Sequence, residues 1–131
     1  MTLTPVRIEW DRARDAFRDT QILHSSGGFD GAASRAYYAA FHAVTTLFSV
    51  AGHSFTKHSA LETAVHRDLV KTGRWPRSLG HDFSFCLELR GVSDYGTGVR
   101  IDAAQASEAI EAARRILLAV QSDLPEDFPR L

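Results

Sequence analysis

The sequence predicts an all-α fold, an antiparallel up-and-down bundle of four to five helices. Apolar residues recur at three- and four-residue steps through long segments, which is the spacing of one helix face. Glycine and proline divide the chain into five such segments, none of which has the pattern of a strand. The links between them are short, which favours antiparallel neighbours. We predict a single domain over residues 1–131, with its core at about 8–122 and an irregular tail at 123–131.

The first two helices are separated by Gly27 and Gly28, which favour a left-handed stop. The first helix is expected over residues 7–25. The second is expected over residues 30–51, with Asp30 as its N-cap. One flank of the second helix carries only small side chains, which would let another helix approach closely, either in the same chain or from a second copy: Ala32, Ala36, Ala39, Ala40 and Ala43.

Three further helices are expected beyond Gly52. Ser59 and Glu62 have the spacing of a capping box and predict a helix over residues 59–73. The next helix is expected over residues 79–95 and is apolar on two sides, so it should be central or lie at an interface. Asp102 can cap the last helix, which ends near residue 122. Within it, Glu111 and Arg115 have the spacing of an ion pair.

The composition excludes several classes of protein. The net charge of −1 gives no overall field that would attract nucleic acid, although a local basic groove remains compatible with it. The single cysteine, Cys86, excludes an internal disulfide framework and is expected to be a core residue. The charged N-terminal segment does not resemble a signal peptide, and no apolar run is long enough to span a membrane. We therefore expect a cytoplasmic protein.

Three polar residues of the second helix, Arg35, Tyr38 and His42, are spaced by three and four residues. They should lie on one side of this helix, away from its apolar stripe. One interpretation is a solvated face. The other is a site for a nucleotide or phosphate, because adjacent tyrosine and arginine side chains offer stacking together with hydrogen bonds.

Arg90 and Asp94 are separated by four residues in a helix that is otherwise apolar on that side. A guanidinium beside a carboxylate is the arrangement expected for a partly buried charge pair. It could be a structural ion pair that fixes helix register. It could equally be an arginine held by aspartate at the floor of a groove, ready to bind phosphate.

The third helix offers His58, Glu62 and His66 at steps of four residues. A metal site is not favoured, because an N-cap at Ser59 would leave His58 outside the helix. Lys57 and His58 instead form a basic corner beside the helix start. The sequence contains no phosphate-binding glycine loop and no nucleophile elbow, so any nucleotide must be bound by side chains on helices.

These segments together closely resemble the HEPN-domain superfamily, in its branch of small stand-alone proteins. The resemblance covers about residues 8–120. It is carried by Ser34-Arg35-Ala36-Tyr37-Tyr38-Ala39-Ala40-Phe41-His42-Ala43, then Gly52, then Lys57-His58-Ser59, then Leu89-Arg90 followed by Asp94-Tyr95.

The resemblance implies a bundle of four to five helices that dimerises, with a basic groove between subunits. Many members of the superfamily are metal-independent endoribonucleases, often toxins paired with a small nucleotidyltransferase, and others bind RNA or nucleotides without cleaving them. The ribonucleases carry an arginine followed, after four to six residues, by a histidine. Here Arg90 matches the arginine, but residues 94–96 contain no histidine and Tyr95 stands in that window.

We therefore expect an RNA- or nucleotide-binding homodimer, part of a toxin-antitoxin or defence-type module with a nucleotidyltransferase partner, and no metal or cofactor. The alternatives are an endoribonuclease toxin, with Arg90, Asp94 and Tyr95 as catalytic candidates, and an interaction partner without a nucleic-acid ligand. The residues expected to bind the ligand are Arg35, Tyr38, His42, Lys57, His58, Arg90, Asp94 and Tyr95.

Overall fold

The computed structural model describes residues 5–96 and 98–131, so the first four residues of the predicted domain and Thr97 of the predicted connection lie outside it. The fold is all-α, as predicted, and the described residues form no strand. In chain order, the elements are α1 (Pro5–Ser25), α2 (Phe29–Val50), α3 (His58–Ala64), the π-helix η1 (Val65–Val70), α4 (Arg77–Tyr95) and α5 (Ala103–Asp123).

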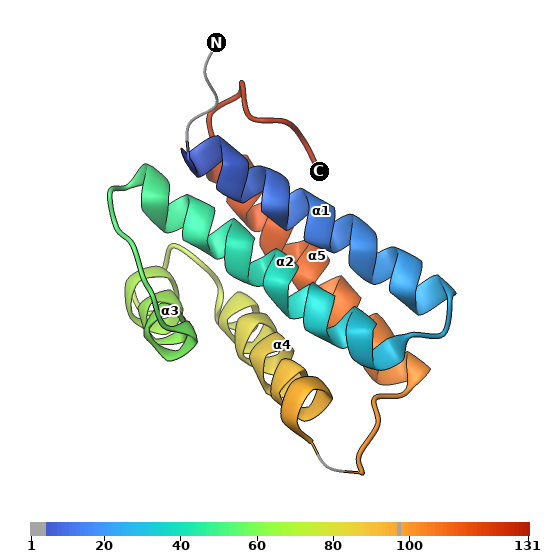
Figure 1. Ribbon diagram of the computed structural model, residues 1–131. Coiled ribbons are helices and arrows are strands. Elements are labelled where there is room, and N and C mark those ends of the chain that lie inside the picture. Colours follow the sequence, from blue (N-terminus) through green and yellow to red (C-terminus); the bar gives the residue numbers. More distant parts are fainter. Residues whose placement is uncertain (1–4, 97) are drawn as a thin grey trace.

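The four long helices alternate in direction, and the shorter α3 lies at one side, beside α2 and α4 (Figure 1). Helix α2 is central, since α1, α4 and α5 all pack against it. Its flank of small residues makes the close approach to α1 and α5 possible. All five alanines of that flank are fully buried within the one chain: Ala32, Ala36, Ala39, Ala40 and Ala43. The small-residue flank therefore packs against helices of the same chain.

Large aromatic side chains anchor the core. Trp10, Tyr37 and Phe83 are fully buried, and Cys86 is buried among them as predicted. The irregular tail returns to α1, where the Trp10 indole Nε1–H donates to the Pro129 carbonyl at 2.6 Å. No helix within residues 5–96 and 98–131 is both long and apolar enough to cross a membrane.

Helix caps agree with the prediction at one position and differ at two. Asp102 caps α5 in a capping box with Gln105. Helix α2 begins at Phe29, before Asp30, whose carboxylate instead accepts a hydrogen bond from the backbone N–H of Ile101 at 2.8 Å. Helix α3 begins at His58, and no side chain caps it, so the predicted N-cap at Ser59 is wrong. In both cases the expected acceptor lies one residue inside the helix, where its side chain no longer reaches the free N–H groups.

Arg115 also has a different partner from the one predicted. It pairs with Asp82 of α4 through two hydrogen bonds of 2.8 and 3.0 Å, while Glu111 pairs with Arg114. The bidentate contact to α4 is the better geometry for a guanidinium and a carboxylate.

The helix predicted over residues 59–73 is divided into α3 and η1. In the π-helix each turn is wider, as the bond from the Lys71 backbone N–H to the His66 carbonyl shows at 2.9 Å. This segment lies close to α4 at Gly80. A Cβ atom on Gly80 would stand 2.8 Å from Cγ2 of Val70, so only glycine permits the observed approach.

Candidate functional site

The strongest cluster of polar side chains surrounds Arg90, near the end of α4. Its Nε atom lies 2.9 Å from Oδ2 of Asp94, one helical turn further on. The buried Nε–H has no aligned acceptor, so this contact is an ion pair rather than a hydrogen bond. Nη2 donates to the hydroxyl of Tyr38 at 3.0 Å and more weakly to that of Tyr95 at 3.4 Å. The guanidinium is therefore fixed from α4 itself and from α2.

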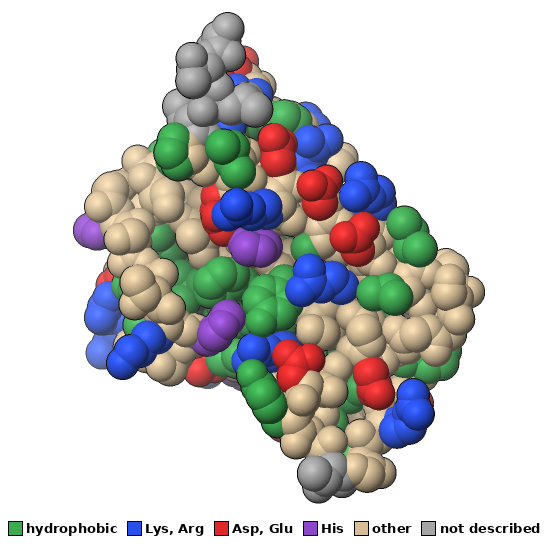
Figure 2. Space-filling view, viewed as in Figure 1, with side chains coloured by type: hydrophobic (Ala, Val, Ile, Leu, Met, Phe, Trp, Pro, Cys, Tyr) green, Lys and Arg blue, Asp and Glu red, His purple; other side chains and the backbone are tan. Residues whose placement is uncertain are grey.

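Aromatic rings enclose the same guanidinium. Its central carbon lies 5.8 Å from the ring centre of Tyr37, 5.6 Å from that of Tyr38 and 5.2 Å from that of Tyr95. Figure 2 shows hydrophobic side chains in the middle of this face, where α2, α3 and α4 meet, bordered by histidine and by both basic and acidic side chains. Burial alone would lower the pKa of Arg90, but the Tyr38 hydrogen bond and the Asp94 charge outweigh it and raise that pKa. Arg90 remains a cation at any physiological pH.

His58, the first residue of α3, lies against the same tyrosines. Its Nδ1 is 2.7 Å from the hydroxyl of buried Tyr37, and its ring centre is 4.8 Å from that of Phe41. Burial raises the pKa of Tyr37 well above its usual value, so this hydroxyl stays protonated. Burial and the nearby charge of Arg90 lower the pKa of His58. At neutral pH the imidazole is therefore uncharged, with Nδ1 accepting from Tyr37 and the proton on Nε2.

The remaining predicted site residues lie at the border of this cluster. Arg35 also stacks on the ring of Tyr38, with its guanidinium carbon 4.7 Å from the ring centre. Lys57 is exposed just before α3, next to His58 in the chain. His42 is directed to α1, where its Nδ1 lies 2.5 Å from Oε1 of Glu9.

Two features of the site were not foreseen in the sequence. Tyr38 and His42 were expected away from the apolar stripe of the second helix, but both rings pack against Phe41. The distance between ring centres is 6.2 Å for Tyr38 and 5.4 Å for His42. His58 of α3 lies against Tyr38 and Phe41, and Glu9 of α1 lies against His42, so residues from two other helices surround these rings. Glu9 also escaped notice, since only the packing of α1 on α2 brings it to His42.

The spaced residues of the third helix do not converge on a common centre. His58 bonds to Tyr37, whereas His66 Nε2 lies 2.8 Å from the hydroxyl of Ser84, which donates to Glu62 at 2.8 Å. In the part of the chain that the structure describes, no group of three His, Cys, Asp or Glu residues has the geometry of a metal site.

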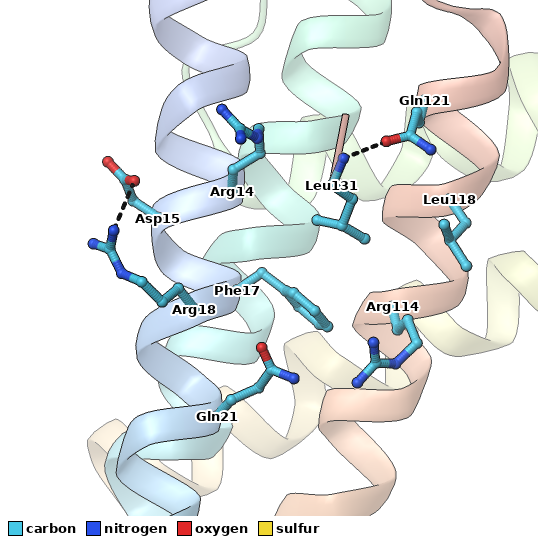
Figure 3. A pocket seen from close by; sticks show the side chains of 9 residues that line it. All are labelled: Arg14, Asp15, Phe17, Arg18, Gln21, Arg114, Leu118, Gln121 and Leu131. Carbon is cyan, nitrogen blue, oxygen red and sulfur yellow. Dashed lines mark hydrogen bonds and ion pairs between the residues drawn. The ribbon is translucent and has the colours of Figure 1, made fainter. Parts of the chain in front are cut away.

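A cavity of about 660 Å³ lies elsewhere, between α1 and α5. Figure 3 shows Phe17 at its centre, with Arg114 reaching towards α1 and Arg18 turned away towards Asp15. Each of the three arginines that line the cavity has a carboxylate partner: Arg14 with Asp11 at 3.4 Å, Arg18 with Asp15 at 3.6 Å and Arg114 with Glu111 at 3.5 Å. Because its charges are balanced in this way, the cavity does not favour an anion.

The Arg90 cluster can bind an anion next to a flat ring. A guanidinium presents N–H donors in a plane that matches phosphate or carboxylate oxygens. Tyr95, 71% exposed, offers an open ring beside it. A nucleotide offers the matching pair of groups, a phosphate for the guanidinium and a planar base for the tyrosine ring.

Comparison with known proteins agrees with the helical architecture. Residues 6–123 match the HEPN domain, so the chain belongs to the HEPN domain family. It is 34% identical over 119 residues to a UPF0332 protein of Thermotoga maritima, covering 91% of this chain and 89% of that protein.

Two solved structures have a similar fold. TT1696 from Thermus thermophilus matches with a TM-score of 0.80 at 22% identity, over 93% of this chain and 100% of that chain. ST0689, described as an archaeal HEPN homologue, matches with a TM-score of 0.73 at 20% identity, over 92% and 98%.

Proposed function

We propose that this HEPN-domain protein binds RNA or a nucleotide by holding a phosphate against Arg90. The observation that carries the proposal is the position of Arg90, whose side chain is only 14% exposed yet is fixed by Asp94 and Tyr38 beside the exposed ring of Tyr95. A cation that is already oriented loses little conformational freedom when it binds, which favours affinity.

The balance of charge around Arg90 also favours an anion. Asp94 offsets one positive charge, but the side chain of Arg35 forms no ion pair with any residue in the described part of the chain. His58 is neutral, because burial and Arg90 lower its pKa. Arg90 and Arg35, which both contact the Tyr38 ring, therefore have one carboxylate ion-pair partner between them, and the binding they give should weaken as salt increases.

The test compares Arg90→Ala with Arg18→Ala, an exposed arginine of α1 that pairs with Asp15 and Asp19. Both variants lose one positive charge. Fluorescence anisotropy with a labelled oligoribonucleotide of about ten residues measures affinity, and adenosine monophosphate serves as the mononucleotide probe.

We expect at least about tenfold weaker binding for Arg90→Ala and wild-type binding for Arg18→Ala, with unchanged far-ultraviolet circular dichroism in both. Equal affinity for the two variants would refute the proposal. A loss of helicity in Arg90→Ala would instead favour a structural ion pair.

Endoribonuclease activity is a second candidate function, and the position of His58 favours it. The window after Arg90 lacks a histidine, but His58 lies against Tyr37 and Tyr38, the same rings that surround Arg90. In the other neutral tautomer, in which Nδ1–H of His58 donates to the Tyr37 oxygen, Nε2 is free to accept the proton of a ribose 2′-hydroxyl as that oxygen attacks the adjacent phosphorus. The 5′-oxygen then leaves and takes a proton from water, giving a 2′,3′-cyclic phosphate and a 5′-hydroxyl.

Cleavage is tested with a purified preparation and a labelled RNA. We expect fragments with 2′,3′-cyclic phosphate ends that disappear in both His58→Gln and Arg90→Ala. Intact RNA with the wild-type protein would exclude this candidate and leave the binding function as it stands.

We further propose that the chain forms a homodimer and pairs with a nucleotidyltransferase in a toxin-antitoxin or defence-type module, as the family resemblance implies. The exposed ring of Tyr95, which lies against Arg90, gives a second copy an apolar surface. Light scattering measures the mass in solution, and co-expression with a neighbouring nucleotidyltransferase gene tests the partner. Co-purification without nucleic acid would instead favour the third alternative, a pure interaction protein.

A further inference from the structure

A second cavity with positive charge lies between η1 and the beginning of α4. Its volume is about 640 Å³, and it is lined by His66, Val70, Lys71, Arg77 and His81. No carboxylate lines it, in contrast to the cavity between α1 and α5, which includes Asp15. Two permanent cations and two imidazoles thus surround one hollow.

The backbone around this cavity has an unusual construction. The π-helical turns of η1 end at Lys71, and such turns are rare and frequently found at functional sites. On the facing helix α4, Gly80 lets His66 and Val70 of η1 approach closely. Any other residue at this position would place a Cβ atom 3.0 Å or less from both side chains. The wall of the cavity therefore depends on a wide helical turn facing a glycine.

The cations of the cavity are not neutralised by the protein. The side chains of Lys71 and Arg77 are exposed and make no hydrogen bond or ion pair with any described residue. Their neighbours differ, since Arg67 pairs with Asp68 at 2.8 Å and Arg74 pairs with Asp123 at 3.2 Å. The two cations that line the cavity are thus the ones left to attract an external anion.

His66 adds a hydrogen-bonding group whose orientation is fixed. The Ser84 hydroxyl donates to Glu62, so it accepts from Nε2–H of His66. This arrangement holds the ring of His66 in place in the wall of the cavity, with Nδ1 and Cε1 each 3.0 Å from the position that a Cβ on Gly80 would take.

We infer that this cavity is a second phosphate-binding pocket, separate from Arg90, in which Lys71 and Arg77 hold a phosphate group. The phosphate could belong to a small phosphorylated molecule or to an RNA strand, and the two sources share the negative charge and oxygen acceptors that Lys71 and Arg77 recognise. The inference does not depend on the function proposed for the Arg90 cluster.

The experiment follows the imidazole C–H resonances of His66 and His81 by NMR while inorganic phosphate, adenosine monophosphate or an oligoribonucleotide is added. The double variant Lys71→Ala/Arg77→Ala removes the two cations of the pocket. The matched control, Arg67→Ala/Arg74→Ala, removes the same charge from two neighbouring residues that already have carboxylate partners.

We expect saturable shifts of both histidine resonances in the wild type and the control, and an affinity at least about tenfold weaker in the Lys71→Ala/Arg77→Ala variant. Saturation by inorganic phosphate and the mononucleotide alike assigns the pocket to small phosphorylated molecules, whereas saturation only by the oligoribonucleotide assigns it to RNA. Shifts that do not saturate with any probe, or that weaken equally in both double variants, would overturn the inference. Arg90→Ala should leave these shifts unchanged.

Discussion

Two glycines of α4, Gly80 and Gly91, give a sensitive test of how closely this helix packs. Both are interior helical positions, but their surroundings differ. A Cβ on Gly80 would lie 2.8 Å from Cγ2 of Val70 and 3.0 Å from two ring atoms of His66, whereas a Cβ on Gly91 would meet nothing within 4 Å. The same substitution to alanine should therefore change the free energy of unfolding in opposite directions.

The magnitudes follow from helix propensity and packing. Alanine is favoured over glycine inside a helix by about 1 kcal/mol, which is the full effect expected for Gly91→Ala. At Gly80 the same gain is opposed by overpacking, which costs about 1–3 kcal/mol. Neither contact yields easily, because Val70 is β-branched and His66 is held by Ser84. We expect Gly80→Ala to be destabilising by about 1 kcal/mol, so the two variants should differ by roughly 2 kcal/mol.

Urea denaturation followed by circular dichroism measures both variants against the wild type. In thermal melts, 1 kcal/mol should correspond to roughly 4 °C in a chain of this length. Stabilisation of Gly80→Ala by as much as Gly91→Ala would refute the close approach of η1 to α4, and with it the shape of the second pocket.

Three further predictions concern groups in or beside the core. The folded state lowers the pKa of His58 below its ordinary value of 6.5, so its contribution to stability is complete above that pH and is lost as pH falls through the lowered pKa. Urea titrations at about pH 7.5 and about pH 5.5 should show this loss in the wild type and a smaller one in His58→Gln. Tyr37→Phe removes the donor to His58 and should lower the free energy of unfolding by about 1 kcal/mol in the same assay. Burial raises the pKa of the Cys86 thiol to about 12, so a thiol reagent should label it only at the rate of global unfolding; rapid labelling of the native protein would contradict its burial.

The helices could be predicted from the sequence because their signals are local. Apolar periodicity located α1, α2, α4 and α5. Asp102 was correctly identified as a cap, and in the structure Gln105 completes a capping box with it. Asp30 was misassigned because its carboxylate has a distant partner, the N–H of Ile101, which only the packed bundle supplies. The π-helical turns of η1 were not predicted, and the approach of His66 and Val70 to Gly80 is likewise a contact between two different helices.

The candidate site was only partly predictable for the same reason. Arg90 and Asp94 are four residues apart in one helix, so their ion pair follows from helical spacing alone. The contact between Tyr37 and His58 joins residues that are 21 apart, and the contact between His42 and Glu9 joins residues that are 33 apart. Neither pair leaves a mark on local periodicity. His58 was identified from its neighbour Lys57, but its neutral state depends on burial and on Arg90, which no local pattern contains.

Asp94 has a role in this site that differs from simple neutralisation. It contacts Arg90 at Nε, on the inner edge of the guanidinium, while Tyr38 and Tyr95 contact Nη2. A carboxylate on Nε restrains rotation of the group without occupying the Nη1 edge, so an incoming phosphate meets donors that are already oriented. If Asp94 only cancelled the charge of Arg90, this largely buried pair would stabilise the fold no more than two apolar residues of similar size. We infer that Asp94 orients Arg90, and on this ground we include the pair in the proposed binding site.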